Sequence, residues 1–96
     1  MKTIWKYPLA ITDIQNVSMP EGAEILTAQM QVGGLCVWAL VETERVSRLR
    51  TIQIYGTGNP MVVESGQYIA SVKENGFVWH VFEERGCLVR SGISAD

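Results

Sequence analysis

Residues 25–42 read ILTAQMQVGGLCVWALVE and contain two strand patterns of different kinds. Apolar and polar side chains alternate over residues 25–32, which is typical of a β-strand with one buried face. The expected buried face holds Leu26, Ala28, Met30 and Val32, and the expected wet face holds Ile25, Thr27, Gln29 and Gln31. From residue 35 up to Glu42 the chain is apolar on both faces, which indicates a strand in the middle of a sheet. Gly33-Gly34 suits a two-residue turn, so this stretch predicts an antiparallel hairpin.

The same kind of alternation recurs on both sides of this hairpin. Strand-like runs cover residues 2–7, 14–19, 50–55, 67–74 and 77–84. Turn-forming residues separate the runs, and Asn75-Gly76 is the strongest hairpin signal because both residues accept a positive φ. No segment has the period of an amphipathic helix. Six or seven short strands with little or no helix predict an all-β domain, a single antiparallel meander folded as a sandwich or a small barrel.

Two further patterns assign faces within the expected strands. Ile52 and Ile54 are expected to point inward, and Tyr68, Ala70 and Val72 are expected to share one face. Residues 77–82 are apolar on both faces apart from His80, so this strand needs cover on both sides. A second sheet supplies such cover, and so does a neighbouring subunit. We therefore expect a homo-oligomer.

The length of 96 residues limits the chain to one domain, which we place at residues 1–84 with a loosely ordered tail at residues 85–96. Hydrophobic residues make up 47% and charged residues 19%, a balance that excludes intrinsic disorder. Eight basic side chains against ten acidic ones give a net charge of -2, so nucleic acid is not an expected partner.

The compartment follows from the cysteines and from segments that the sequence lacks. We find no secretory signal and no apolar run of about 18 residues, so we expect a cytoplasmic protein that has no membrane partner. Cys36 lies in an apolar run and is expected to be a small core side chain. Reduced thiols are the simpler interpretation, and a single Cys36–Cys87 disulfide is the alternative.

The loop Gly56-Thr57-Gly58-Asn59-Pro60 is the main candidate for ligand binding. Exposed backbone amides in such a loop can hold an anion, although a tight turn between strands is the favoured interpretation. Neither a P-loop nor a dinucleotide fingerprint is present. Residues 42–50 carry several charges and are interpreted as a solvated connection, with room for one helical turn. The candidate ligand-binding residues are Arg48 and Arg50 for phosphate charge, Tyr55 for stacking, Gly56, Thr57, Gly58 and Asn59 for backbone contacts, and His80.

Groups for catalysis and metal binding are sparse. His80 is the single histidine, and no Ser-His-Asp set can be assembled around it. The carboxylates that could serve it are Glu83, which alternation places on the opposite strand face, and Glu64. Cysteine and histidine are too scattered for a zinc site, so we expect no metal and no cofactor. Binding rather than catalysis is the favoured interpretation, and a small hydrolase or isomerase that uses His80 is an alternative.

Several segments together resemble a family of small domains of unknown function found in bacteria and tailed phages. The matching segments are Met1–Leu9, Met19–Ala23, Val37–Val41, Tyr55–Pro60 and His80–Glu83. They cover residues 1 to about 84 in order, and none is a catalytic signature. Family members often carry histidine before the proline of the glycine-rich loop, where this chain has Asn59. The resemblance therefore implies a shared loop shape, not a shared imidazole.

The resemblance implies a phage or prophage setting for a small protein that lacks catalytic groups. We expect a binding protein that inhibits a bacterial immune effector, either by covering a protein surface or by sequestering a nucleotide signal between subunits. The partner would then be a bacterial protein or a small nucleotide. A structural or assembly accessory protein is the remaining alternative.

Overall fold

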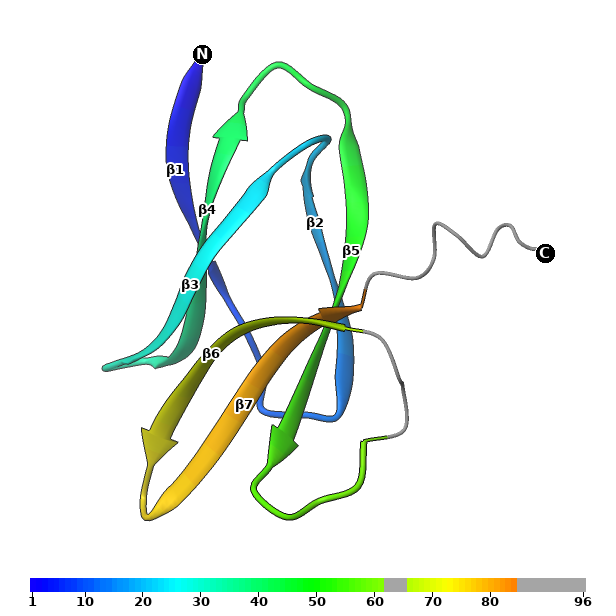
Figure 1. Ribbon diagram of the computed structural model, residues 1–96. Coiled ribbons are helices and arrows are strands. Elements are labelled where there is room, and N and C mark those ends of the chain that lie inside the picture. Colours follow the sequence, from blue (N-terminus) through cyan, green and yellow to red (C-terminus); the bar gives the residue numbers. More distant parts are fainter. Residues whose placement is uncertain (62–65, 85–96) are drawn as a thin grey trace, which may run out of the picture.

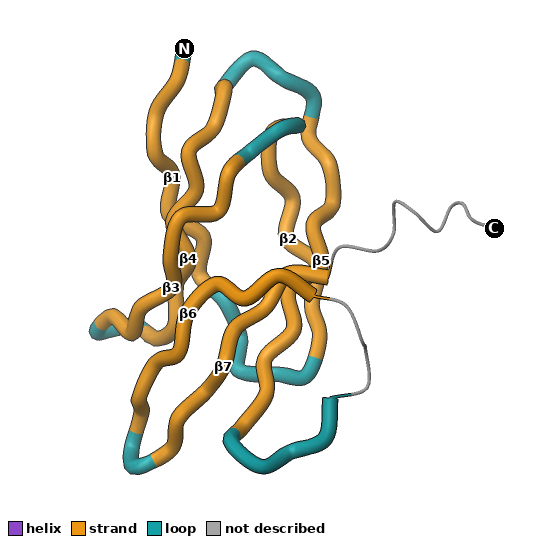
Figure 2. The backbone as a smooth tube through the Cα atoms, viewed as in Figure 1, coloured by secondary structure: helices purple, strands orange, loops and turns teal. Residues whose placement is uncertain are grey.

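The computed structural model describes residues 1–61 and 66–84, and this part of the chain consists of strands joined by turns and loops (Figure 2). The strands are β1 (Lys2–Pro8), β2 (Ile14–Pro20), β3 (Glu24–Gln31), β4 (Gly34–Glu42), β5 (Ser47–Gly56), β6 (Gly66–Glu74) and β7 (Phe77–Glu84). No helix occurs among these residues. The predicted all-β class is confirmed. The predicted tail, residues 85–96, lies outside the described residues.

The strands form two antiparallel sheets that pack as a sandwich (Figure 1). One sheet has the order β1-β4-β3 and the other the order β2-β5-β7-β6. Strand β4 has a neighbour on each side, as predicted from its two apolar faces, and β7 also lies inside its sheet, between β5 and β6. Consecutive strands pair only in the hairpins β3–β4 and β6–β7. The strand order therefore departs from a simple meander, because three of the six connections, β1–β2, β2–β3 and β4–β5, cross to the other sheet.

The hydrophobic core lies between the two sheets. Its buried members are Met19, Ala23, Ala28, Leu35, Val37, Ala39, Val41, Ile52, Ile54, Val72 and Val81. Alternate residues of β4 and β5 supply six of them, as expected for strands with one face on the core. Cys36 is buried as predicted, but it lies on the outer face of β4 and not in this core. Its proposed partner Cys87 lies outside the described residues.

Two β-bulges place residues on other strand faces than strict alternation predicts. The register between β3 and β4 shifts between Ile25 and Thr27, and the register between β6 and β7 shifts between Tyr68 and Ala70. A bulge inserts one unpaired residue and moves everything before it to the other face. Leu26 is consequently 43% exposed while Ile25 packs on the core. Tyr68 is likewise on the outer face, opposite to Ala70.

The connections also differ from two predictions. The two-residue turn of the β3–β4 hairpin is Val32-Gly33, one position earlier than predicted, because Gln31 pairs with Gly34. Gly34, and not Gly33, has the positive φ. Residues 42–50 were expected to form a solvated connection, but only residues 43–46 lie outside strands and no helical turn forms. Pairing with β2 extends β5 back to Ser47, which places Arg48 and Arg50 on a strand.

The turn between β6 and β7 has the predicted Asn75-Gly76 geometry, with φ of 51° and 85°. We expect Gly76→Ala to lower the free energy of unfolding by about 1 kcal/mol, because a Cβ is strained at positive φ. Gly33→Ala is the matched control, since Gly33 lacks a positive φ and its new Cβ would have no heavy atom within 4 Å. Urea denaturation of both variants measures the difference. Equal losses would contradict this assignment of strain.

The outer face of the three-stranded sheet keeps apolar side chains in contact with solvent. Trp38 and Leu40 of β4 are half-buried there, and their neighbour Ile4 on β1 is exposed. The sandwich thus covers one face of β4 and leaves the other uncovered by the described residues. The homo-oligomer stays a prediction. The described chain has no helix long and apolar enough to cross a membrane.

Candidate functional site

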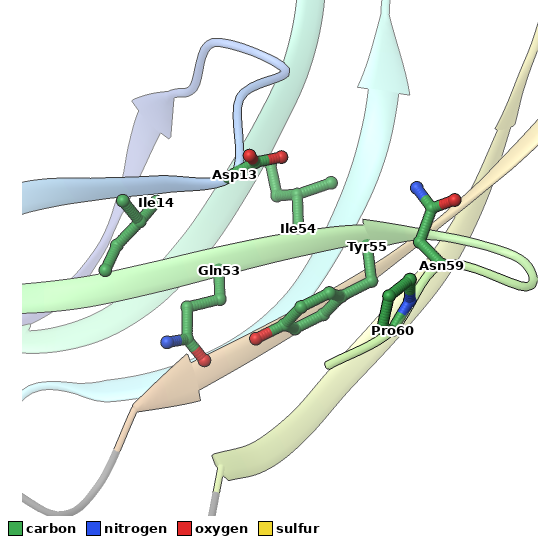
Figure 3. A pocket seen from close by; sticks show the side chains of 7 residues that line it. All are labelled: Asp13, Ile14, Gln53, Ile54, Tyr55, Asn59 and Pro60. Atoms are coloured by element: carbon green, nitrogen blue, oxygen red, sulfur yellow. The ribbon is translucent and has the colours of Figure 1, made fainter. Parts of the chain in front are cut away.

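A cavity of about 310 Å³ lies beside the C-terminal half of β5 (Figure 3). It is called the β5 cavity here, and its lining residues are Asp13, Ile14, Gln53, Ile54, Tyr55, Asn59 and Pro60. Antiparallel pairing of β2 with β5 brings Ile14 opposite Gln53. The loop after β5 then brings Asn59 and Pro60 to the same place. Exposed residues from two loops and β2 therefore surround Ile54 and two buried polar side chains of β5.

Those two buried side chains are Gln53 and Tyr55, with exposed fractions of 2% and 8%. Both lie on the outer face of β5, since the intervening Ile54 is in the core. Gln53 Oε1 and the Tyr55 hydroxyl are buried, and neither has a hydrogen-bond partner among the described residues. Leaving such a group unpaired costs about 1–3 kcal/mol. Figure 3 shows both side chains extending from the same side of β5, with the Tyr55 hydroxyl turned toward the Gln53 amide.

Aromatic rings of neighbouring strands hold Tyr55 in place. Its ring meets Phe82 of β7 edge to face, with centroids 6.0 Å apart and planes at 77°. Tyr68 of β6 meets the same Phe82 ring at 5.5 Å and 69°. Edge-to-face pairs of this kind stabilise an arrangement beyond the area that they bury. The position of the Tyr55 hydroxyl is therefore fixed by packing across three strands.

The glycine-rich loop turns sharply at the end of β5. The main-chain N–H of Asn59 donates to the Gly56 carbonyl at 3.0 Å, and Gly58 has a φ of 90°. A Cβ on Gly56 would lie 3.0 Å from Asn59 Nδ2 and 3.3 Å from Trp79 Cζ3. Glycine at position 56 thus lets the loop and the Trp79 indole approach each other. This contact brings Asn59 to the rim of the β5 cavity.

His80 lies next to the loop and is engaged through both ring nitrogens. Thr57 Oγ1 is 2.8 Å from Nε2, and Ser71 Oγ is 2.8 Å from Nδ1. The Tyr68 hydroxyl in turn is 2.9 Å from Ser71 Oγ. Hydroxyls donate or accept, so they satisfy either tautomer of the imidazole. His80 does not line the β5 cavity.

Arg48 and Arg50 are not brought to this loop. Arg50 lies five residues before Tyr55 on an extended strand, which is about 17 Å away at about 3.3 Å per residue. Its guanidinium pairs with both carboxylate oxygens of Glu83, one at 3.0 Å, and donates to the Ala23 carbonyl at 2.8 Å. Arg48 lies 3.7 Å from Glu21 on the surface. The structure therefore gathers Tyr55, the loop and His80, but not the two arginines that were expected to supply phosphate charge.

Charges around the β5 cavity are few. Of the lining residues in the described part of the chain, Asp13 is the one with a charged side chain, and it is exposed. Its main-chain carbonyl accepts the Ile54 amide at 3.2 Å, which ties the loop before β2 to β5. Within the described ranges, no three histidine, cysteine, aspartate or glutamate side chains come together as a metal site would need.

The sequence interpretation overlooked Gln53, Asp13, Ile14 and Pro60 as parts of this site. A signal for Gln53 was present, because it is a single polar residue between two core isoleucines. Alternation assigns it to the outer face, where polar residues are ordinary. Its burial follows from its neighbours in the sheet, Ile14 on one side and Phe82 on the other. Sequence spacing does not reveal that juxtaposition.

The fold and the site define a small antiparallel β-sandwich with a partly enclosed cavity on the outer face of its larger sheet. Residues 1–87 match the family model described as Domain of unknown function (DUF7352), and the chain belongs to this family. The resemblance to a family of small domains of unknown function is thereby confirmed. No curated protein and no solved structure matches the chain.

Proposed function

We propose that this chain is a non-catalytic binding protein that holds a small ligand in the β5 cavity. The observation that carries the proposal is a pair of buried polar atoms on two residues that line the cavity, Gln53 Oε1 and the Tyr55 hydroxyl, and neither atom has a partner among the described residues. Native proteins leave few such atoms unpaired, and a functional role is one of the recognised reasons. A volume of about 310 Å³ lies at the lower end of the range for ligand pockets.

The surroundings of His80 favour binding over catalysis. Both ring nitrogens already contact hydroxyl groups, and the histidine lies beside the cavity instead of lining it. Glu83, one of the two carboxylates considered as its partner, pairs with Arg50 on the opposite face of the sheet. Glu64, the other, lies outside the described residues. A general acid or base must reach the proton that it transfers, and no described carboxylate serves His80 in this way.

A thermal-shift screen of the full chain against a chemically diverse set of small molecules tests the proposal. A ligand at about 100 times its Kd adds about 2.7 kcal/mol of stability. For a domain of this size that raises the unfolding midpoint by about 10 °C or more. We expect hits that are recovered unchanged after long incubation, as mass spectrometry would show. A screen without hits, or a hit that is consumed, would contradict non-catalytic binding.

A second candidate function is hydrolysis, and one distance favours it. Ser71 Oγ lies 2.8 Å from His80 Nδ1, within the reach that a base needs to activate a nucleophile. Ser71 is also exposed, so a reagent can approach it. A fluorophosphonate probe separates the two functions. Labelling that disappears in Ser71→Ala would favour a hydrolase, and we expect no labelling.

The role in the cell stays a prediction within the class of binding proteins. We propose inhibition of a bacterial immune effector in a phage or prophage setting. Of the two routes considered, sequestration of a nucleotide through its phosphate has less support, because Arg48 and Arg50 lie far from the loop. A plaque assay on a host that carries a defence system, with and without this protein, tests the role. Copurification with phage particles would instead favour an assembly accessory.

A further inference from the structure

The two unpartnered groups restrict the chemistry of the ligand. An amide side chain such as that of Gln53 carries an acceptor oxygen and a donor nitrogen, and the Tyr55 hydroxyl can donate or accept. The two groups extend from the same side of β5 and approach each other (Figure 3). A ligand that satisfies both must present an N–H donor to Gln53 Oε1 and a second polar atom beside it. Nucleobase edges have this pattern, and Gln or Asn amides are the usual readers of the adenine edge.

The other residues that line the β5 cavity restrict the shape and the charge of the ligand. Ile14 and Pro60 add apolar side chains to the lining beside the polar pair, and apolar lining suits a ring that buries its faces. Asn59 adds a second amide at the rim. Among the described residues that line the cavity there is no lysine or arginine, and Asp13 carries the one charge. A phosphate would therefore meet a carboxylate and no cation, whereas an uncharged ring meets no repulsion.

We infer that the β5 cavity binds an uncharged planar heterocycle of the nucleobase kind, as a free base or a nucleoside, through Gln53 and Tyr55. This inference rests on the proposed function and names the class of its ligand. It also replaces the phosphate-centred site expected from the sequence. The glycine-rich loop then acts through the Asn59 side chain at the cavity rim, and not through an anion held by its backbone amides.

Isothermal titration calorimetry of the full chain tests the inference with a fixed set of probes. The set contains adenine, guanine, cytosine and uracil, their nucleosides, and the corresponding 5′-monophosphates. We expect at least one base or nucleoside to bind, and the matching monophosphate to bind at least about tenfold more weakly because of Asp13. Tighter binding of the monophosphate would overturn the inference.

Two variants with matched controls connect binding to the cavity. Gln53→Met and Tyr55→Phe keep the size of each side chain and remove its polar atoms, so each should weaken binding about tenfold or more. Gln29→Met makes the same change at an exposed position on β3. Tyr7→Phe removes another buried hydroxyl that lacks a partner, outside the cavity. Both controls should keep the affinity within about twofold.

Measurements without ligand keep the test valid if a variant folds poorly. Removing an unpaired buried polar atom should leave the unfolding midpoint unchanged or higher. A clearly lower midpoint for both Gln53→Met and Tyr55→Phe would overturn the inference, because the atoms would then be paired within the protein. If other compounds from the screen bind the cavity but no base or nucleoside does, the ligand class is wrong and the proposed function stands. If no compound of any class binds, the proposed function itself fails.

Discussion

Replacing Ile52 by alanine is expected to lower the free energy of unfolding by about 3 kcal/mol. Ile52 lies on the inner face of β5 and is fully buried in the core between the sheets. Removing three carbons there loses their transfer free energy and leaves a cavity that strands from two sheets cannot fill. A loss of this size is a large part of the total stability of a small domain, and it should lower the unfolding midpoint by about 15 °C.

Leu49→Ala on the same strand is the matched control. It removes the same number of carbons, but Leu49 is 69% exposed. Its expected loss is below about 0.5 kcal/mol, because a surface side chain gives up little burial. Urea denaturation followed by tryptophan fluorescence measures both variants. Comparable losses at positions 49 and 52 would mean that the inner and outer faces of β5 are assigned incorrectly.

The strands were predictable from the sequence because their burial repeats every two residues. Each run of alternating side chains coincides with a strand, and the doubly apolar run of residues 35–42 identified β4 as the middle strand of its sheet. The strand order was not predictable in the same way. Pairing partners such as β2 with β5 are set by contacts between distant segments, and a period of two contains no information about them.

The errors in face assignment share one physical cause. Leu26 was predicted to share a face with Ala28, and Tyr68 with Ala70, but a bulge in β3 and another in β6 place them on the opposite faces. A bulge adds one residue without changing composition, so alternation cannot detect it. The bulged strands are the edges of their sheets on the same side of the sandwich, where β3 and β6 approach without pairing. The bulges are thus features of tertiary packing.

The candidate site was predicted in part. Tyr55, Thr57 and Asn59 were grouped because they are neighbours in the sequence, and they remain together in the structure. His80 joins them because β7 pairs with β5, with Tyr55 opposite His80. Arg48 and Arg50 were grouped with them by charge alone. The charge of a residue does not indicate where its side chain lies relative to the loop. Because β5 is extended, Arg48 and Arg50 lie far from the loop that follows it.

Replacing Arg50 by methionine is the second change with a large expected effect, a loss of about 3 kcal/mol. The Arg50 and Glu83 side chains are only 22% and 16% exposed, and the guanidinium also donates to the Ala23 carbonyl. This arrangement joins β5, β7 and the turn between β2 and β3. Removing the cation leaves the Glu83 carboxylate without its partner in a largely dry place, which costs more than the lost attraction.

Two further variants distinguish the loss of the Arg50–Glu83 ion pair from the general effect of removing an arginine. Arg48→Met removes a cation two residues away on the same strand, but Arg48 is 61% exposed and its ion pair with Glu21 should contribute less than about 1 kcal/mol. The double variant Arg50→Met with Glu83→Leu should recover most of the loss, because no buried charge then remains unpaired. A double variant that is no more stable than Arg50→Met alone would show that the arginine acts through the Ala23 carbonyl and through packing instead. In that case the Glu83 contact would be secondary, and the β2–β3 turn would be the element that depends on Arg50.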